Sequence, residues 1–528
     1  MSTLAGVSPV PLLATEGHAK EAAGGRRRDT PAFAAGAVIA GAAILLTVLI
    51  CWPRSELARN RYVGTTLLSQ EKASICGTPV PRVGGVPWVQ VLGGPPMEPV
   101  DLHWIRRVCT PLYPGPNCSN ATTWRGTVTL CVDGKPIQGV KMHTRGHVSK
   151  MFPKQQFSLK LPTSVGLFGM ASARKWIIAT SFIDTSFQRN PFAFHLHRQL
   201  GGWAAQTRYV NLQIQGQSYG LYTIGERIQR SSGRLHLPKS RKQQAHDSGY
   251  LLTVDWEKPG KSWVESPNTS TVFSFLYPKR PSRQQHSFVQ RLVNEIDSAA
   301  LVALTCPPSH GCGDDLGRLV DFSSFARFFI IEELAKDVDG YAFSVFVAIE
   351  RGRLVHAAPW DFDLAFGFDC QSLYYHNALT GVDTTGTVTG WNVENLRDTA
   401  AWIGPTGWPG GAVWEFGLNK RQLFLNIWRD PGFRTTFMKT WQSARRAGGV
   451  LSSEELQKAI LHRADSIAVA AEEDMHLWRG TERCAFWTCC NPSASQDFGK
   501  ATEKLLQFVL ARAAWIDTAV LTLLGAAQ

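Results

Sequence analysis

The sequence predicts a two-part α+β body that follows a single membrane-spanning helix. Three observations lead to this fold class. Residues 31–53 form an uncharged apolar segment, residues 126–230 alternate between apolar and polar positions, and the sequence after residue 280 repeats apolar residues with helical periodicity. The chain has 528 residues, of which 44% are hydrophobic and 18% are charged, so it can form a sizeable core and is not mainly disordered.

The first element is the apolar segment "PAFAAGAVIAGAAILLTVLICWP", which contains no charge from Pro31 to Pro53. About 20 apolar residues suffice for a helix to cross the hydrocarbon core of a membrane. The polar leader is longer than the usual start of a signal peptide, and the apolar stretch is longer than its usual core. We therefore expect an uncleaved signal anchor behind a short cytoplasmic tail of residues 1–30.

Cysteines and glycosylation sequons indicate which side of the membrane the body occupies. Ten of the eleven cysteines follow the anchor, at positions 76, 109, 118, 131, 306, 312, 370, 484, 489 and 490. Sequons begin at Asn117, Asn120 and Asn268. Both features are typical of an oxidising compartment, so we expect a type II membrane glycoprotein whose body is lumenal, in the ER or Golgi, or extracellular. The disulfide pairing stays open.

The formal charge of +13 does not indicate nucleic-acid binding, because the basic residues are scattered and form no dense block beyond Arg26, Arg27 and Arg28. The basicity instead favours acidic or phosphorylated partners.

Residues 54–125 are rich in Pro and Gly and are predicted to form a stem or N-terminal extension. In the strand-rich N-terminal part, residues 126–230, the pair Asp133-Gly134 predicts a hairpin and "FSLKL" predicts a further strand. "PFAFHLHRQLGG" has Pro at a plausible first turn and a glycine stop, so it predicts a helix. A second hairpin is expected around Gly216.

The helix-rich part covers residues 231–480, and residues 481–528 form a cysteine-containing helical extension. The terminal segment "TEKLLQFVLARAAWIDTAVLTLL" could be mistaken for a second membrane span. Its Lys504, Arg512 and Asp517 instead favour an amphipathic helix packed on the body.

The stretch "PWDFDLAF" places Asp361 and Asp363 in an apolar run. On a strand, residues two apart point to the same face, so both carboxylates would lie side by side. Two buried carboxylates need compensation, and oxygen ligands select Mg²⁺ or Mn²⁺, whose shell phosphates and water can complete. The alternative is an edge strand with these aspartates in solvent or at a helix N-terminus.

A second acidic stretch, "KDVDGYAFS", carries Asp339 just upstream. The strand "VFVAI", a turn at Gly352 and a returning strand predict a hairpin that brings Asp339 and Asp361 to the same end. That layout suits phosphoryl transfer, in which one Asp positions the acceptor hydroxyl and the other holds the metal. The alternative for Asp339 is a plain Asp-Gly turn.

Five ordered segments together resemble the CotH (spore-coat protein H) kinase family: "TRGHVSKMFPKQQFSLKL", "DTSFQRNPFAFHLHRQL", "YGLYTIGERI", "DVDGYAFSVFVAI" and "PWDFDLAFG". The resemblance extends from about Gly126 to Trp478, roughly two thirds of the chain. It implies an atypical, bilobal protein-kinase-like fold with a strand-rich N-lobe and a helix-rich C-lobe. It also implies a secreted or surface-exposed enzyme that transfers the γ-phosphate of ATP to Ser or Thr of proteins.

The resemblance implies a role for each matching residue. Asp339 is similar to the catalytic base, Asp361 is similar to the metal-binding Asp, and Asp363 is a second acidic group near the metal. For the nucleotide, Arg145 lies in the loop that would cover it, Lys160 stands where a phosphate-binding Lys is expected, and Glu226 lies near the interlobe connection. Lys154 could replace Lys160, and Glu226 could equally form a structural salt bridge.

The sequence departs from ordinary kinases at Ser344, which stands five residues after Asp339 where an Asn would bind a second metal. No GxGxxG loop or HRD motif is present. Two alternatives therefore stay open. One is a type II Golgi glycosyltransferase that uses Asp361-Phe362-Asp363 as a metal site, and the other is an inactive kinase-like scaffold at the cell surface.

Overall fold

The computed structural model describes residue 76 and residues 82–94, 124–146, 149, 152, 154–255, 260–305, 314–337, 339–368, 387–394, 418–479 and 497–525. All of them belong to one compact unit, Ser69–Gln528. The expected tail and membrane anchor, the sequons at Asn117 and Asn120, and the cysteines other than Cys76 and Cys131 lie outside the described residues.

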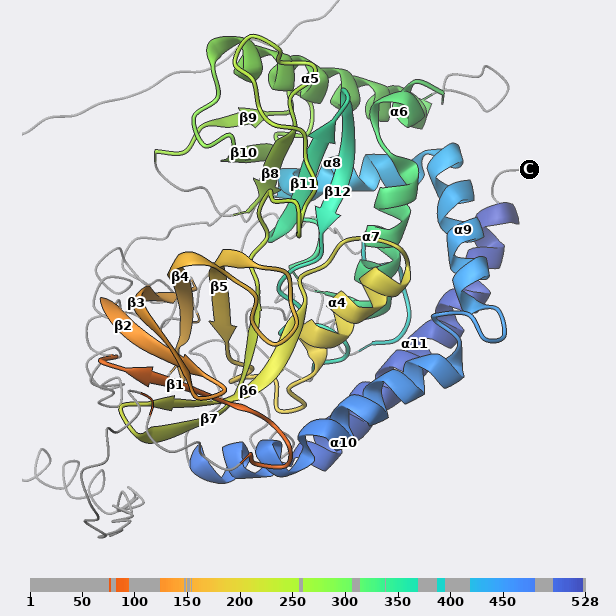
Figure 1. Cartoon of the computed structure of the whole chain (residues 1–528). Helices are drawn as coiled ribbons and strands as arrows, with labels where there is room; N and C mark the ends of the chain where they lie inside the picture. Colours follow the sequence, from red (N-terminus) through yellow and green to blue (C-terminus); the bar gives the residue numbers. More distant parts are fainter. Residues whose placement is uncertain are drawn as a thin grey trace, which may run out of the picture. The chain divides into compact units, whose positions relative to one another are not determined.

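The strands of the N-terminal part form a closed barrel in the order β1-β2-β3-β4-β5-β7-β6, which parallel pairing of β1 with β6 completes (Figure 1). Within the described ranges the barrel strands are β1 (Trp88–Leu92), β2 (Arg125–Val132), β3 (Lys135–Arg145), β4 (Gln156–Val165), β5 (Ala173–Ala179), β6 (Thr207–Ile214) and β7 (Gln217–Glu226).

Side-chain alternation produces the barrel core. Phe157, Leu159 and Leu161 of β4 all point inward and are buried, as the period of two predicts. The hairpin predicted at Asp133-Gly134 is confirmed, because both residues adopt positive φ, +48° and +71°, between paired strands β2 and β3. The hairpin around Gly216 is confirmed between β6 and β7.

The helix-rich part contains a sheet of its own, which the sequence predicted only in part. Its strands, in the order β12-β11-β8-β10-β9, pair antiparallel with their neighbours. They are β8 (Tyr250–Val254), β9 (Trp263–Glu265), β10 (Val272–Tyr277), β11 (Val345–Glu350) and β12 (Arg353–Ala358). The class is therefore α+β, with one sheet closed into a barrel and one open.

Helices cover the open sheet and connect it to the barrel. The described helices are α4 (Arg189–Gln199), α5 (Arg283–Thr305), α6 (Asp314–Leu319), α7 (Phe322–Ala335), α8 (Leu418–Arg429), α9 (Pro431–Arg445), α10 (Ser453–Leu477) and α11 (Phe498–Gly525). Side chains of Asp321, Asp430 and Ser452 accept backbone N–H groups at the starts of α7, α9 and α10. Helix α7 is buried almost all round, so it is the central helix of this part.

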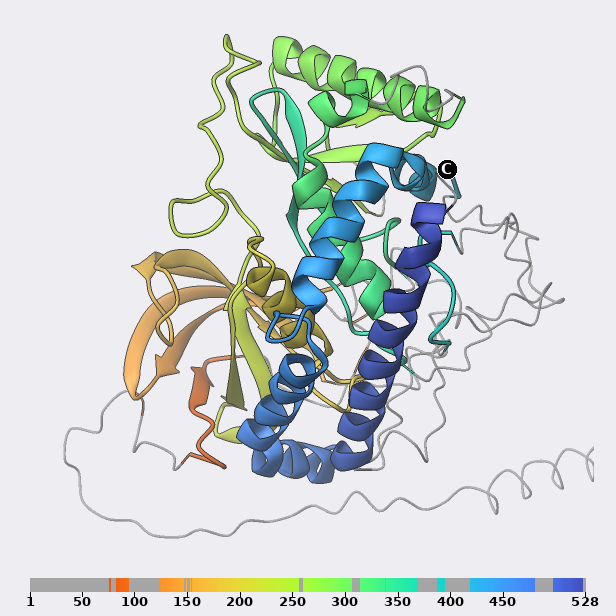
Figure 2. The ribbon, with the colours of Figure 1, turned by 90° about the vertical axis from the view of Figure 1, so that its right-hand side faces the viewer.

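Helix α11 belongs to the largest core cluster, as the amphipathic interpretation of this segment expected. Leu505, Val509, Ile516 and Val520 are buried in that cluster, and Figure 2 shows α11 running alongside α10 and α9. Among the described residues, α11 is the one helix long and apolar enough to cross a membrane by length and composition.

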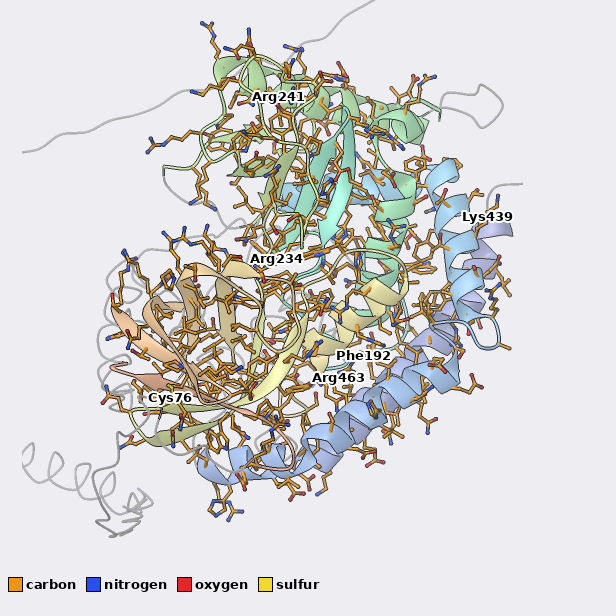
Figure 3. The ribbon with its side chains drawn as sticks, viewed as in Figure 1. Cys76, Phe192, Arg234, Arg241, Lys439 and Arg463 are labelled. Atoms are coloured by element: carbon orange, nitrogen blue, oxygen red, sulfur yellow. A yellow bond between two sulfur atoms is a disulfide. The ribbon has the colours of Figure 1, made fainter. Side chains whose placement is uncertain are left out.

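A buried ion pair fastens the barrel to α10. The Lys154 ammonium pairs with the Asp474 carboxylate, and both side chains are fully buried. Lys154 also donates to the Leu221 carbonyl at 2.8 Å and lies 4.7 Å from the centre of the Tyr222 ring. A second contact joins α10 to α4, where the Arg463 guanidinium lies 5.8 Å from the Phe192 ring centre (Figure 3).

The structure differs from the predicted stem at two places. Trp88–Leu92 form β1 and close the barrel. Cys76 forms a disulfide with Cys131 of β2, and this bridge fastens the N-terminal extension to the barrel. The alternation in "WVQVL" was the signal for this strand, but the surrounding Pro and Gly residues obscured it.

Candidate active site

The predicted hairpin is confirmed as β11 and β12, which pair antiparallel around Arg351 and Gly352. Ser344 directly precedes β11, and Asp361 follows β12 by three residues. The Ser344 hydroxyl donates to Asp361 Oδ2 at 3.2 Å, so the two ends of the hairpin meet.

The prediction that Asp361 and Asp363 lie on a strand is wrong, because β12 ends at Ala358 and both residues belong to the loop of residues 359–368, named here the Asp361 loop. Asp361 has φ +72°, a left-handed conformation that bends the backbone away from the strand. Asp361 is exposed at the surface, although the protein packed around its carboxylate still desolvates it in part, while Phe362 between the two aspartates is fully buried.

Asn190, at the start of α4, holds the Asp361 loop in place. Its Oδ1 accepts the backbone N–H of Phe362 at 2.8 Å, and its Nδ2 donates to Asp363 Oδ1. The preceding residue, Arg189, donates to the Ala365 carbonyl at 2.8 Å and pairs with the buried carboxylate of Asp184. The sequence did not predict these contacts, because Asn190 and Phe362 are 172 residues apart.

Arg145 approaches the acidic residues from the end of β3. Its guanidinium lies 5.5 Å from the centre of the Trp360 ring and donates to Gln156 at 3.2 Å. Desolvation lowers the pKa of Arg145, and the charges of Asp361 and Asp363 oppose this shift. The structure thus brings the predicted nucleotide residue Arg145 together with both predicted metal ligands.

The carboxylates at this site are held under mutual repulsion. Desolvation raises the pKa of Asp363 well above its ordinary value, and the neighbouring charges of Asp361 and Asp184 raise it further. The pKa of Asp361 is also raised by desolvation, although Arg145 and the Ser344 hydroxyl partly compensate. Several acidic groups beside one arginine leave an excess of negative charge that a divalent cation would neutralise.

The Asp339 loop, defined by its described residues 336, 337 and 339–344, joins the same acidic group. The backbone N–H of Asp339 donates to Asp337 Oδ1 at 3.3 Å. Burial raises the pKa of Asp337 well above its ordinary value, and the charges of Glu332, Asp339 and Asp361 raise it further. Asp337 is therefore close to both Asp339 and Asp361, and it is a buried carboxylate of the site that sequence reasoning missed.

Backbone strain is concentrated in these two loops. Lys336, Tyr341, Ser344, Asp361 and Phe366 all have positive φ, between +48° and +72°. Non-glycine residues rarely adopt this conformation, and it costs about 1–3 kcal/mol for each residue. Such strain is typical of sites whose side chains are held in a required geometry.

Lys160 lies on the outer face of β4 and is exposed, in register with Lys141 of β3 and Lys175 of β5. Desolvation lowers the pKa of Lys175, and the charges of Arg227, Lys279, Lys160 and Arg174 lower it further. Lys175 and these four side chains form a basic group, and the charge of Arg227 also lowers the pKa of Arg145. Lys160 itself lies four residues along β4 from Gln156, which pairs with Arg145, so the structure does not bring Lys160 together with the acidic residues.

The structure places the two other candidates away from the acidic residues. Glu226 accepts the backbone N–H of Gln206 at 2.9 Å and lies 3.6 Å from Arg234, which is the structural salt bridge that the sequence left open. Lys154, the substitute for Lys160, is the buried partner of Asp474. In Figure 3, Arg234 lies between the barrel and the open sheet.

The donor set suits a hard divalent cation that a ligand helps to hold. Among the described residues, no group of three or more His, Cys, Asp or Glu side chains has the arrangement of a complete metal site. Asp361 and Asp363 supply two carboxylates, and Mg²⁺ typically uses one or two carboxylates together with water and substrate phosphates. The residues therefore fit a cation that binds together with a phosphorylated ligand.

Comparison with protein families gives a match that covers most of the chain. The family model described as CotH kinase protein matches residues 142–516, which include the barrel from the middle of β3, the Asp339 and Asp361 loops and most of α11. A search of curated proteins finds no match.

Proposed function

The chain belongs to the CotH kinase family, and from this premise we propose that it transfers the γ-phosphate of ATP to Ser or Thr hydroxyls of secreted or surface proteins. In this proposal the barrel acts as the N-lobe and the helix-rich part acts as the C-lobe of a kinase-like body. The family match favours this activity over the glycosyltransferase alternative.

The position of Arg145 is the observation that carries the proposal. Its guanidinium lies 5.5 Å from the ring centre of Trp360, the residue before Asp361, and the charges of Asp361, Arg227 and Asp363 all act on its pKa. A nucleoside triphosphate needs both environments, because its phosphates attract cationic side chains while its bound metal needs carboxylates. We assign Arg145 and Lys160 to the phosphates, and Asp361 with Asp363 to Mg²⁺ or Mn²⁺.

The reaction then needs little covalent chemistry from the protein. The oxygen of the acceptor hydroxyl bonds to the γ-phosphorus while Asp339 accepts the proton of this hydroxyl. The bond from the γ-phosphorus to the β,γ-bridging oxygen breaks at the same time and releases ADP. The metal, when bound, neutralises charge that develops on the phosphate oxygens. Arg145 holds the phosphates, and Asn190 holds the backbone that carries Asp361.

Ser344 bears on whether the enzyme is active, since Asn is expected at this position in kinase loops. Its hydroxyl donates to Asp361, so a polar contact to the metal-binding carboxylate is retained. A second metal has fewer ligands here than in ordinary kinases. This residue also supports the alternative of an inactive scaffold.

The proposed location is a lumenal or extracellular one behind the anchor of residues 31–53. Two observations support it. Cys76 and Cys131 form a disulfide, and disulfides persist mainly in oxidising compartments. Asn268 is exposed in the turn between β9 and β10, where a glycan could be attached.

The purified full-length chain with radiolabelled ATP and either Mg²⁺ or Mn²⁺ tests the proposed function. We expect label on the protein itself or on an added protein acceptor, with loss of labelling on chelation of the metal and in Asp339→Asn. Turnover of a nucleotide sugar without use of ATP would support the glycosyltransferase instead. A folded chain with neither activity would support the scaffold.

A further inference from the structure

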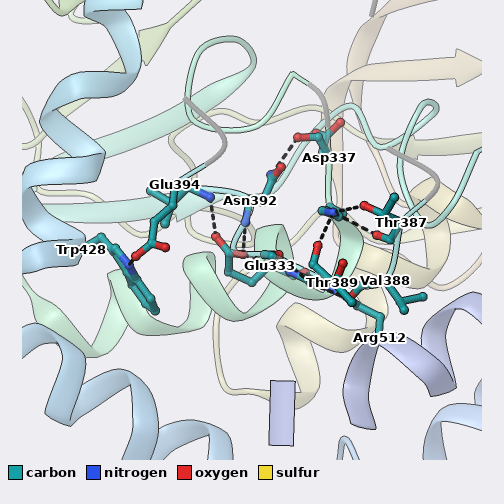
Figure 4. A network of polar contacts seen from close by, with 12 residues as sticks. Glu333, Asp337, Thr387, Val388, Thr389, Asn392, Glu394, Trp428 and Arg512 are labelled. Carbon is teal, nitrogen blue, oxygen red and sulfur yellow. Dashed lines mark hydrogen bonds and ion pairs between the residues drawn. The ribbon is translucent and has the colours of Figure 1, made fainter. Parts of the chain in front are cut away.

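Beneath the proposed active site, a buried polar network joins three separate segments of the chain (Figure 4). Its centre is Glu333 in the last turn of α7. The Glu333 carboxylate accepts hydrogen bonds from the Tyr341 hydroxyl at 2.8 Å and from the backbone N–H groups of Asn392 and Val393 at 2.5 and 2.8 Å. Arg512 of α11 pairs with the same carboxylate at 3.2 Å.

Arg512 distributes its donors over two segments. It donates to the Glu333 carbonyl at 2.7 Å, and to the carbonyls of Val388 and Gly390 at 2.7 and 2.8 Å. Its side chain and that of Glu333 are fully buried. Burial lowers the pKa of Arg512 to about 10, so the guanidinium remains charged at neutral pH.

Lys336, the first residue of the Asp339 loop, binds the same segment from the other side. Its ammonium donates to the carbonyls of Thr387 and Thr389 at 3.0 and 2.5 Å, and to the Thr387 hydroxyl at 2.6 Å. Asn392 then donates to the Asp337 carbonyl at 2.9 Å. Residues 387–394, named here the anchored segment, are therefore tied to both α7 and the Asp339 loop.

We propose that Glu333, Arg512 and Lys336 are positioning residues for phosphoryl transfer, which hold the Asp339 loop in its strained form through the anchored segment. The Lys336 ammonium and the Arg512 guanidinium together donate to the four carbonyls of residues 387–390. The Glu333 carboxylate receives four donors, from the Asp339 loop, the anchored segment and α11. The left-handed conformations of Lys336, Tyr341 and Ser344 need such over-determined surroundings to persist. This proposal rests on the proposed function.

The proposal makes a prediction for Arg512→Lys and Lys336→Asn. Lysine keeps the charge of Arg512, but its single nitrogen carries three donors and cannot replace a guanidinium that binds four acceptors through three nitrogens. Asparagine tolerates the left-handed conformation of residue 336 but lacks the long ammonium arm. We expect each variant to lower kcat by about 10- to 100-fold, since small misplacement of a reacting group has effects of this size. The KM for ATP is expected to stay within about twofold, because the nucleotide residues are untouched.

Asp517→Asn provides the matched control on the same helix. Asp517 anchors α11 to α9 through Arg445 at 2.6 Å and Trp441 at 2.9 Å, and neither bond involves the anchored segment. If Asp517→Asn lowers kcat as much as Arg512→Lys, the effect reflects helix packing alone and the proposal is wrong. Unchanged kcat in both Arg512→Lys and Lys336→Asn would also overturn it.

Hydrogen exchange in the same variants separates this proposal from the proposed function. We expect Arg512→Lys and Lys336→Asn to accelerate exchange in both residues 339–344 and residues 390–394, whereas Asp517→Asn leaves both slow. If the wild-type chain is inactive, the proposed function is wrong. The hydrogen-exchange rates of the variants would then decide by themselves whether the network holds the Asp339 loop. Faster exchange confined to residues 390–394 would contradict the coupling.

Discussion

Replacement of Asp361 by Asn is expected to lower phosphoryl transfer by on the order of 10³-fold, because it removes a charged oxygen ligand from the proposed metal site. The fold should survive, since Asn can still accept the Ser344 hydroxyl. Desolvation already raises the pKa of Asp361, and its charge raises that of Asp363. The loss of this charge relieves repulsion, so the unfolding midpoint is expected to stay the same or rise.

The measurement for Asp361→Asn pairs initial rates of ATP-dependent labelling with thermal unfolding. Asp247→Asn is the control, because that carboxylate is exposed and its ion-pair partner is the exposed ring of His246. Full activity in Asp361→Asn would remove this residue from the metal site. Lost activity together with a strongly lowered unfolding midpoint would indicate a structural role instead.

The second large effect is on stability. We expect Lys154→Met to lower the free energy of unfolding by about 3–5 kcal/mol, because the Asp474 carboxylate is left buried without its charged partner. The double variant Lys154→Met with Asp474→Asn should recover much of this loss, since the amide oxygen can still accept the Leu221 N–H.

Denaturant unfolding followed by fluorescence measures the Lys154 effect. Lys458→Met is the matched control, because the Lys458–Glu455 pair is exposed and such pairs contribute about 0–1 kcal/mol. A loss in Lys154→Met no larger than in the control would show that the buried pair does not hold the barrel to α10. A double variant less stable than the single one would contradict the charge argument.

Local patterns in the sequence were sufficient to predict the hairpins of the molecule. The Asp133-Gly134 turn and the alternation of β4 depend on neighbouring residues alone, so both could be predicted. The β11–β12 hairpin could be predicted in the same way, and this prediction correctly placed Asp361 near the Asp339 loop. Strand β1 was missed because its five residues lie in a Pro- and Gly-rich stretch.

Long-range polar contacts could not be predicted, because a single sequence contains no local signal for them. Asn190 is one of several polar residues of α4, and nothing nearby shows that it binds the backbone 172 residues later. Lys154 stands in a polar stretch that suggests exposure, and its partner Asp474 is 320 residues away. Arg512 was interpreted as part of a polar helix face, yet it is fully buried against Glu333.

The strand prediction for Asp361 and Asp363 failed for a local reason. The period-two pattern continues past Ala358, where the strand ends, and the left-handed conformation of Asp361 breaks it. Because alternation describes side-chain polarity and not backbone dihedral angles, the pattern predicted which residue is buried between the aspartates but not the shape of the backbone.

The central claim is that the carboxylates of the Asp361 loop hold a divalent cation that binds the phosphates of ATP. A crystal of the chain with Mn²⁺ and a non-hydrolysable ATP analogue tests it through the anomalous signal of manganese. The account predicts a manganese peak coordinated by Asp361 and by phosphate oxygens, with Arg145 against the same phosphates. Bound nucleotide without manganese at Asp361, or nucleotide bound away from Arg145, would contradict it.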